Sequence, residues 1–503
     1  MKKNRSVGLI LSYATTFLNM VCGLFLSSFL LKQTGDADYG VYQTMSSFAN
    51  YLVLLEFGTG TVLTRNIAAC RARGESKLAI EKNISTIWTI TTVLSVLILL
   101  VSVAFYFSID FIYSRSMTPT QVLLGKRIFI FVVVGLECSF SFQTLKGIAL
   151  AYEHYTYSSI AAIGKIIART CLLIAIMLRF RNVVLIAVVD AAISVALVVI
   201  TYIYCKSNFK IRIQYKDFDK TILKTSLPLC LALFLQTVVN QSNNSVGKFV
   251  LGVMSGPEEV TLYSVGLYVF SIFSSLSTIP VSLYVPQVTK DVTSGLEGLE
   301  LTKTLVQPCR LIVLVSGSVL FGFIACGKQF ISIVYGEAYL LSWIMAILLM
   351  APMFLNMSNA VVLNVLDVKN KRIIRSYLLM ITTALNILMT IFGIRYFGII
   401  AAAAATGIST LIQVFVMNIY YQKAIGIKVL YLFENIYKGI LPYQMLGAVV
   451  GFVVGTLVHN VYISFAVAGC AYVLVAFGGF VLFGKSAAET HMLHRVSRRI
   501  RHK

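Results

Sequence analysis

Long apolar stretches separated by short polar segments recur along the whole chain. Most are about 20 to 25 residues long, which is the length that a helix needs to cross the hydrocarbon core of a bilayer. No polar block is large enough to fold as a separate soluble domain. The pattern predicts an all-α integral membrane protein with about 14 transmembrane helices, near residues 7–31, 40–63, 84–108, 125–148, 155–178, 183–205, 225–250, 261–285, 304–326, 340–364, 377–396, 398–421, 441–458 and 462–483.

Composition and charge agree with this pattern. The 503 residues are 58% hydrophobic and only 12% charged, which is too apolar for a soluble protein of this length. Most Lys and Arg residues fall in the termini and in alternate loops, which places both termini inside the cell by the positive-inside rule. Contact of these basic loops with anionic membrane lipids accounts for the net charge of +22, so no nucleic-acid partner is expected.

Two short segments resemble each other at a distance of 221 residues. TGDADYGVYQ at 34–43 and SGPEEVTLYS at 255–264 match in their small, Gly, acidic and Tyr positions. The match predicts two six-helix lobes related by a pseudo-two-fold axis along the membrane normal. The expected parts are an N-lobe (helices 1–6), a C-lobe (helices 7–12), helices 13 and 14, and a basic cytoplasmic tail, at 1–210, 211–422, 423–484 and 485–503 respectively.

A polar stripe runs along the expected span 225–250. Asn240, Asn244 and Lys248 recur every fourth residue and therefore lie on one face of a helix. Asn19 occupies the position equivalent to Asn240 in the other half of the chain. The stripe is either a seam between helices held by amide hydrogen bonds or the lining of a water-filled cavity that binds substrate. Lys248 has a further alternative, because it lies near the outer end of its span and can extend towards the interface.

Two cations lie deep in the expected span 155–178. Lys165 is about 15 Å into this helix, close to the middle of a core about 30 Å thick, and Arg169 follows one turn later. Two charges at this depth cost about 5 to 7 kcal/mol, so they require water, anionic partners or an anionic ligand. Glu137 and Asp190 are the candidate counter-ions in neighbouring spans, and full neutralisation within the lobe is the alternative to ligand binding.

The remaining chemistry favours transport over catalysis. Glu56, within LLEFGTG, is a candidate coupling residue for protons or sodium, a counter-ion, or a partner of nearby basic residues. The five histidines fall in loops or in the tail, no phosphate-binding loop occurs, and the nine cysteines form no CxxC pair. We therefore expect no catalytic residues, no cofactor and no metal site.

Four motifs carry a family resemblance. GDADYGVYQ at 35–43, LLEFGTGTVLTR at 54–65, ARGE at 72–75 and SGPEEVTLYS at 255–264 resemble patterns of Wzx-type flippases, which export the repeat units of O-antigen and capsule. These flippases are members of the multidrug/oligosaccharidyl-lipid/polysaccharide exporter superfamily. One departure is Gly247, which stands where relatives often have an acidic residue.

The resemblance implies a function that fits the polar residues. It implies two bundles facing each other across a cavity, and movement of undecaprenyl-diphosphate-linked oligosaccharide from the inner to the outer leaflet of the bacterial cytoplasmic membrane. A polysaccharide polymerase and glycosyltransferases are candidate partners. The alternatives are a cation-coupled multidrug exporter or a flippase for the lipid precursor of peptidoglycan, both of the same superfamily. A membrane-bound glycan polymerase or ligase is disfavoured because no large outer loop is present.

Overall fold

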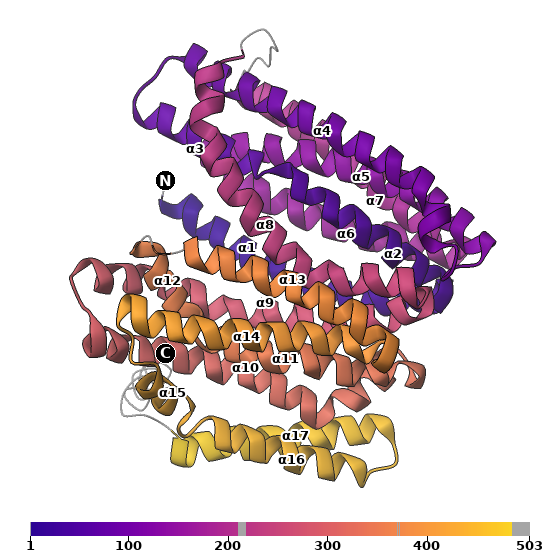
Figure 1. Ribbon diagram of the computed structural model, residues 1–503, viewed down its shortest axis with the longest axis vertical. Coiled ribbons are helices and arrows are strands. Elements are labelled where there is room, and N and C mark those ends of the chain that lie inside the picture. The colour runs from indigo at the N-terminus through magenta and orange to yellow at the C-terminus, as the bar shows by residue number, and fades with distance from the viewer. Residues whose placement is uncertain (1, 210–217, 370, 372, 485–503) are drawn as a thin grey trace. The chain divides into compact units, whose positions relative to one another are not determined.

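The computed structural model describes residues 2–209, 218–369, 371 and 373–484, and these residues form helices without any strand (Figure 1). The first half of the chain contains α1 (Lys2–Thr34), α2 (Asp36–Leu52), the 3-10 turn η1 (Val53–Glu56), α3 (Thr59–Ala72), α4 (Lys77–Tyr113), α5 (Pro119–Ala151), α6 (Tyr155–Phe180), α7 (Val184–Phe209) and α8 (Lys220–Met254). The second half contains α9 (Pro257–Thr293), α10 (Gly298–Val334), η3 (Glu337–Tyr339), α11 (Leu341–Ser358), α12 (Ala360–Val368), α13 (Ile373–Phe397), α14 (Ile400–Ile425), α15 (Val429–Tyr437), α16 (Leu441–Thr456), α17 (Val461–Gly479) and η4 (Phe480–Gly484).

Most of the expected spans are helices of sufficient length and apolarity. Within the described residues, 11 helices can cross a membrane by these criteria, or 12 if the bent pair α15 and α16 forms one span. The two other expected spans, 40–63 and 225–250, coincide with the broken segment from α2 to α3 and with α8. The all-helical membrane fold is therefore confirmed, whereas the count of 14 spans stays a prediction. The basic tail at 485–503 lies outside the described residues.

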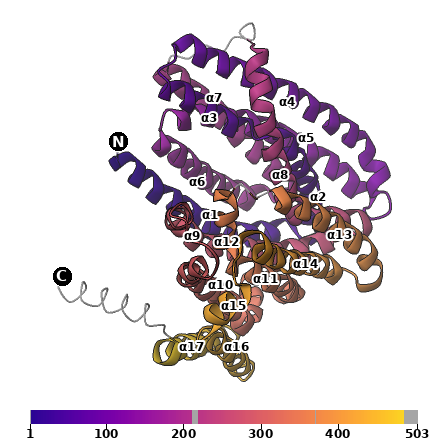
Figure 2. The same ribbon diagram turned by 60° about the vertical axis from the view of Figure 1, so that its left-hand side comes forward.

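The helices group into two compact units, Met1–Thr261 and Leu262–Lys503. In the first unit α5 lies between α4 and α7, and both views show these three helices side by side (Figures 1 and 2). Helix α8 also belongs to this unit by its contacts with α2 and α4, although the sequence division assigns it to the C-lobe. The division into lobes after residue 210 stays a prediction.

The two similar segments share a break between two helices at a glycine with positive φ. Gly35 ends one long helix with φ 82°, and Gly256 ends another with φ 107°. Each is followed at once by a helix with acidic residues in its first turn. Helix α2 also lies very close to the start of α9, since a Cβ atom on Gly40 would lie 1.8 Å from the carbonyl oxygen of Pro257. Only a glycine permits this approach of two backbones.

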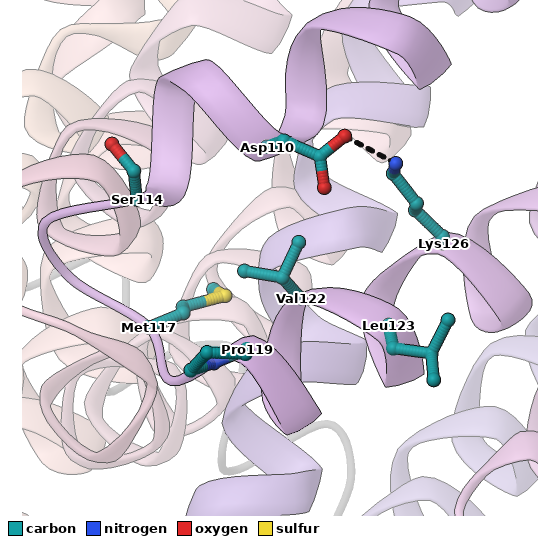
Figure 3. Close-up of a pocket in the computed structure, with 7 residues that line it drawn as sticks. All are labelled: Asp110, Ser114, Met117, Pro119, Val122, Leu123 and Lys126. Atoms are coloured by element: carbon teal, nitrogen blue, oxygen red, sulfur yellow. Dashed lines mark hydrogen bonds and ion pairs between the residues drawn. The ribbon is translucent and has the colours of Figure 1, made fainter.

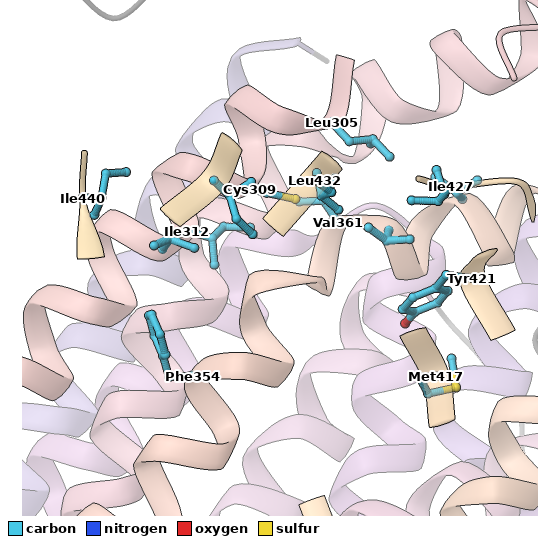
Figure 4. Packing of buried hydrophobic residues seen from close by; sticks show 14 of the residues in the cluster. Leu305, Cys309, Ile312, Phe354, Val361, Met417, Tyr421, Ile427, Leu432 and Ile440 are labelled. Carbon is cyan, nitrogen blue, oxygen red and sulfur yellow. The ribbon is translucent and has the colours of Figure 1, made fainter. Parts of the chain in front are cut away.

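The second unit has a continuous apolar core. Fully buried side chains of α10, α12 and α15 meet there, as Figure 4 shows for Leu305, Cys309, Ile312, Val361 and Leu432. Close packing of such side chains supplies the main attraction between helices where no water is displaced.

Arg310 connects three segments at one end of this core. The residue is only 5% exposed, and its guanidinium donates to the carbonyl oxygens of Asn435 at 2.7 Å, Lys438 at 2.8 Å and Gly484 at 2.9 Å. These carbonyls lie at the ends of α15 and η4, where a helix leaves its last acceptors unpaired. Arg310 therefore holds the C-terminal helices to α10.

Candidate functional site

A polar break interrupts the second expected span in the first unit. Helix α2 passes into η1, which ends at Glu56, and the chain then turns through Phe57 and Gly58, both in the left-handed region with φ 52° and 64°. The ring of Phe57 stacks on Phe234 with centroids 4.5 Å apart. In a continuous helix the half-buried Glu56 carboxylate would lie on another face. The break therefore determines where this carboxylate lies.

Arg169 and Asp190 form an ion pair between α6 and α7. Nε of Arg169 donates to Oδ1 of Asp190 at 2.6 Å, and Nη2 donates to Oδ2 at 3.0 Å. Tyr42, on α2, donates its hydroxyl to the same carboxylate at 3.1 Å. The two charged side chains are only about one-third exposed, so the bidentate geometry fixes both in place. The expected counter-ion relation of Asp190 to Arg169 is thus present.

Two lysines near this pair have no such partner. Lys165 lies one turn before Arg169 on α6, and Lys146 lies on α5. Both are half-buried, and neither forms an ion pair or a hydrogen bond with any residue that the structure describes. Lys146 lies near the carboxylate of Glu56, whereas Lys165 lies near the carboxylate of Asp190.

Lys248 contacts α2 within the same unit. Its Nζ donates to Oε1 of Gln43 at 3.1 Å, one residue beyond Tyr42. The contact fixes the ammonium against a neutral amide, so the positive charge is hydrogen-bonded without being neutralised. Asn240 and Asn244 precede it on α8, and their side chains lie outside the described residues.

Two further predicted residues lie apart from this group. Glu137, on α5, accepts a hydrogen bond from Ser95 on α4, and its Oε1 is buried without a partner among the described residues. Glu137 therefore faces α4 and not the cations of α6. Asn19 is exposed on α1.

The resulting cluster is rich in hydrogen-bond donors and in positive charge. Among the described residues, Lys146, Lys165 and Lys248 contribute three cations beyond the neutralised Arg169 and Asp190 pair, and Glu56 contributes one carboxylate. Cations in an apolar, half-buried setting favour an anion with several oxygen acceptors.

Sequence reasoning missed three members of this cluster. Tyr42 and Gln43 belong to the motif GDADYGVYQ, and the motif does not indicate that their side chains contact charged residues. Lys146 stands near the end of the expected span 125–148, where a lysine ordinarily extends to the interface. Its signal was the same as that of Lys165, namely a charge within an apolar helix.

Comparisons with known proteins agree on the fold. The family described as polysaccharide biosynthesis protein matches residues 2–290, more than half of the chain. A structure of the lipid II flippase MurJ in an inward closed conformation aligns with a TM-score of 0.66 and 16% identity, over 93% of this chain and 98% of that one. No curated protein matches this sequence.

Two further structures are multidrug transporters. An inward-facing MATE family transporter of the MOP superfamily aligns with a TM-score of 0.60 and 13% identity, over 84% of this chain and 96% of that one. A mutant of the Vibrio cholerae MATE transporter VcmN gives a TM-score of 0.53 and 13% identity, over 84% and 98%. These likenesses, at 13 to 16% identity, show that the chain shares the fold of these flippase and transporter structures.

Proposed function

The chain belongs to the polysaccharide biosynthesis protein family, and on this premise we propose that it moves a lipid-linked oligosaccharide across the bacterial cytoplasmic membrane. The cargo would be a prenyl-diphosphate carrying a sugar repeat unit, delivered from the inner to the outer leaflet. The family resemblance in the motifs at 35–43 and 54–65 supports this substrate class. The shared fold with a lipid II flippase supports the type of movement.

The proposal depends mainly on Lys146 and Lys165, which form no ion pair with any residue that the structure describes. A diphosphate carries about two negative charges and several acceptor oxygens, and it cannot enter hydrocarbon unaided. Lys146 and Lys165 offer two ammonium groups without an ion-pair partner among the described residues. Binding of the diphosphate would therefore supply acceptors and opposite charge to both ammonium groups.

The other residues of the cluster have supporting roles in this proposal. Arg169 is held by Asp190 and Tyr42, so it shapes the site and contributes little free charge. Lys248, Gln43 and the neighbouring Asn240 and Asn244 would contact the sugar hydroxyls or the phosphate. Access would alternate between the two sides through motion of the two predicted lobes.

The lysine pair can be tested by substitution. We expect Lys146→Ala and Lys165→Ala together to lower surface polysaccharide at least about tenfold, which corresponds to losing roughly one charge-assisted contact. Lys165→Arg should retain most export because it keeps the charge. The matched control is Lys224→Ala, which removes a charge from an exposed position on α8. Normal export by the double variant at normal protein level would refute the assignment.

A lipid precursor of peptidoglycan is the second candidate substrate. Its diphosphate presents the same chemistry to the lysines, and the MurJ structure supplies the likeness in fold. Rescue of growth in cells depleted of their lipid II flippase would favour this candidate. Failure to rescue, together with transport of a polysaccharide repeat unit in proteoliposomes, would favour the first.

A further inference from the structure

An open cavity of about 480 Å³ lies at the end of α4 and the start of α5 in the first unit (Figure 3). Lys146 lies near the opposite end of α5. Its lining is apolar on one side and charged on the other. Figure 3 shows Met117 and Val122 facing the space that Asp110 and Lys126 close on the opposite side. The remaining lining residues are Ser114, Pro119 and Leu123.

The charged side of the cavity is an ion pair in which the carboxylate is more exposed than the ammonium. Nζ of Lys126 pairs with Oδ2 of Asp110 and also lies 5.4 Å from the centre of the Tyr106 ring. The Lys126 side chain is only 19% exposed, whereas that of Asp110 is 61% exposed. The ammonium is thus held in position by an anion and an aromatic face, while the carboxylate keeps free acceptor capacity towards the cavity.

The loop that closes the cavity is fixed by hydrogen bonds. Ser116 donates its hydroxyl to the carbonyl oxygen of Gly252 on α8 at 2.8 Å. Thr118 caps α5 through a reciprocal pair of bonds with Gln121, and Pro119 occupies the first turn. A cavity with walls fixed in this way needs little rearrangement to accept a ligand.

The position of the cavity suits an amphiphile. It lies at the boundary of the expected spans 84–108 and 125–148, where apolar helix meets water. Exposed apolar side chains continue from it along the helices, with Phe107 73%, Phe111 87% and Leu123 53% exposed. An acyl chain can lie on this surface while a polar head group occupies the cavity.

We propose that this cavity binds a phospholipid with a primary-amine head group, of the phosphatidylethanolamine class. The phosphate would contact the Lys126 ammonium, and the head-group ammonium would donate to the Asp110 carboxylate. A zwitterion set against an ion pair gains two opposite-charge contacts and adds no net charge. A quaternary amine has no N–H to donate, and an anionic lipid meets the exposed carboxylate, so both bind more weakly.

Native mass spectrometry of the full chain in detergent tests the proposal. We expect one phosphatidylethanolamine to be retained at least about tenfold more tightly than phosphatidylcholine or phosphatidylglycerol of equal chain length, in proportion to one lost charge-assisted contact. Asp110→Asn and Lys126→Gln should each lower retention to the phosphatidylcholine level. Equal retention of the three lipids by the wild-type protein would overturn the proposal.

Matched variants separate binding from folding. Lys369 and Glu297 form another ion pair of similar exposure, 20% and 72%, in the second unit, so Lys369→Gln should leave retention unchanged. The exchange Asp110→Lys with Lys126→Asp keeps an ion pair but reverses the order of charges seen by the head group, and it should lose binding while unfolding at the wild-type temperature. Unchanged retention in this exchange would refute a lipid site.

Discussion

At the scale of single residues, whether a charge in an apolar helix is neutralised depends on the residues that neighbouring helices place beside it. Lys165 and Arg169 lie one turn apart on α6 and look equivalent in the sequence. Arg169 is neutralised by Asp190 in a planar, bidentate pair, whereas Lys165 has no ion-pair partner among the described residues. The fork of a guanidinium matches a carboxylate better than an ammonium does, so the arginine takes the available anion. The lysine is therefore the better candidate for binding substrate.

Removing one partner of the Arg169–Asp190 ion pair should lower the free energy of unfolding more than removing both partners. We expect Asp190→Asn to lower the free energy of unfolding by about 1 to 3 kcal/mol, because Arg169 keeps its charge but loses its counter-ion. The double variant Asp190→Asn with Arg169→Gln should recover part of this loss. Thermal unfolding in detergent measures both, and strictly additive losses would contradict the coupling.

At the scale of elements, the break between α2 and α3 positions Glu56. Leu233 of α8 packs so closely against Gly58 that a Cβ atom there would lie 2.7 Å from its Cδ1. The positive φ and the close approach both require glycine. The motif LLEFGTG is therefore a structural requirement of the broken segment as well as a family pattern.

A pair of glycine variants separates these two requirements. Gly74 has nearly the same conformation, with φ 67°, but nothing within 4 Å of the position of a Cβ atom. We expect Gly74→Ala to destabilise by about 1 kcal/mol from backbone strain, and Gly58→Ala by about 2 to 4 kcal/mol because overpacking adds to it. If the two variants lowered the unfolding temperature equally, the Leu233 side chain would move aside without destabilising the protein, and overpacking would not contribute.

At the scale of the whole molecule, the distribution of Lys and Arg predicts which loops lie outside. The loop between α4 and α5 should be external and that between α12 and α13 internal. This orientation also places the proposed lipid site in the outer leaflet. The net charge of +22 then belongs largely to the cytoplasmic face.

Labelling of single cysteines in intact cells checks this orientation. In a background where the exposed Cys171 and Cys470 are replaced, a membrane-impermeant maleimide should label Thr120→Cys and leave Lys371→Cys unlabelled until the cells are opened. Both positions are exposed, so access differs only by side of the membrane. The reverse pattern would place the termini outside.

Helical character and polar chemistry were predictable because they depend on local sequence. Apolar stretches of spanning length gave the all-helical membrane fold, and charges within them identified Lys165, Arg169 and Asp190. The sequence did not decide which carboxylate pairs with Arg169, because Glu137 and Asp190 both lie in neighbouring spans. The structure assigns Asp190 to Arg169 and directs Glu137 towards Ser95.

By itself, the sequence determined that the chain is a multi-pass helical membrane protein with cations in its interior, because hydrophobicity and charge are properties of each residue. Only the tertiary structure decided which cations have an ion-pair partner among the described residues, and that Gln43 of α2 bonds Lys248 of α8. Those relations depend on contacts between segments up to 205 residues apart, and the spacing of residues along one helix cannot specify what faces it from another.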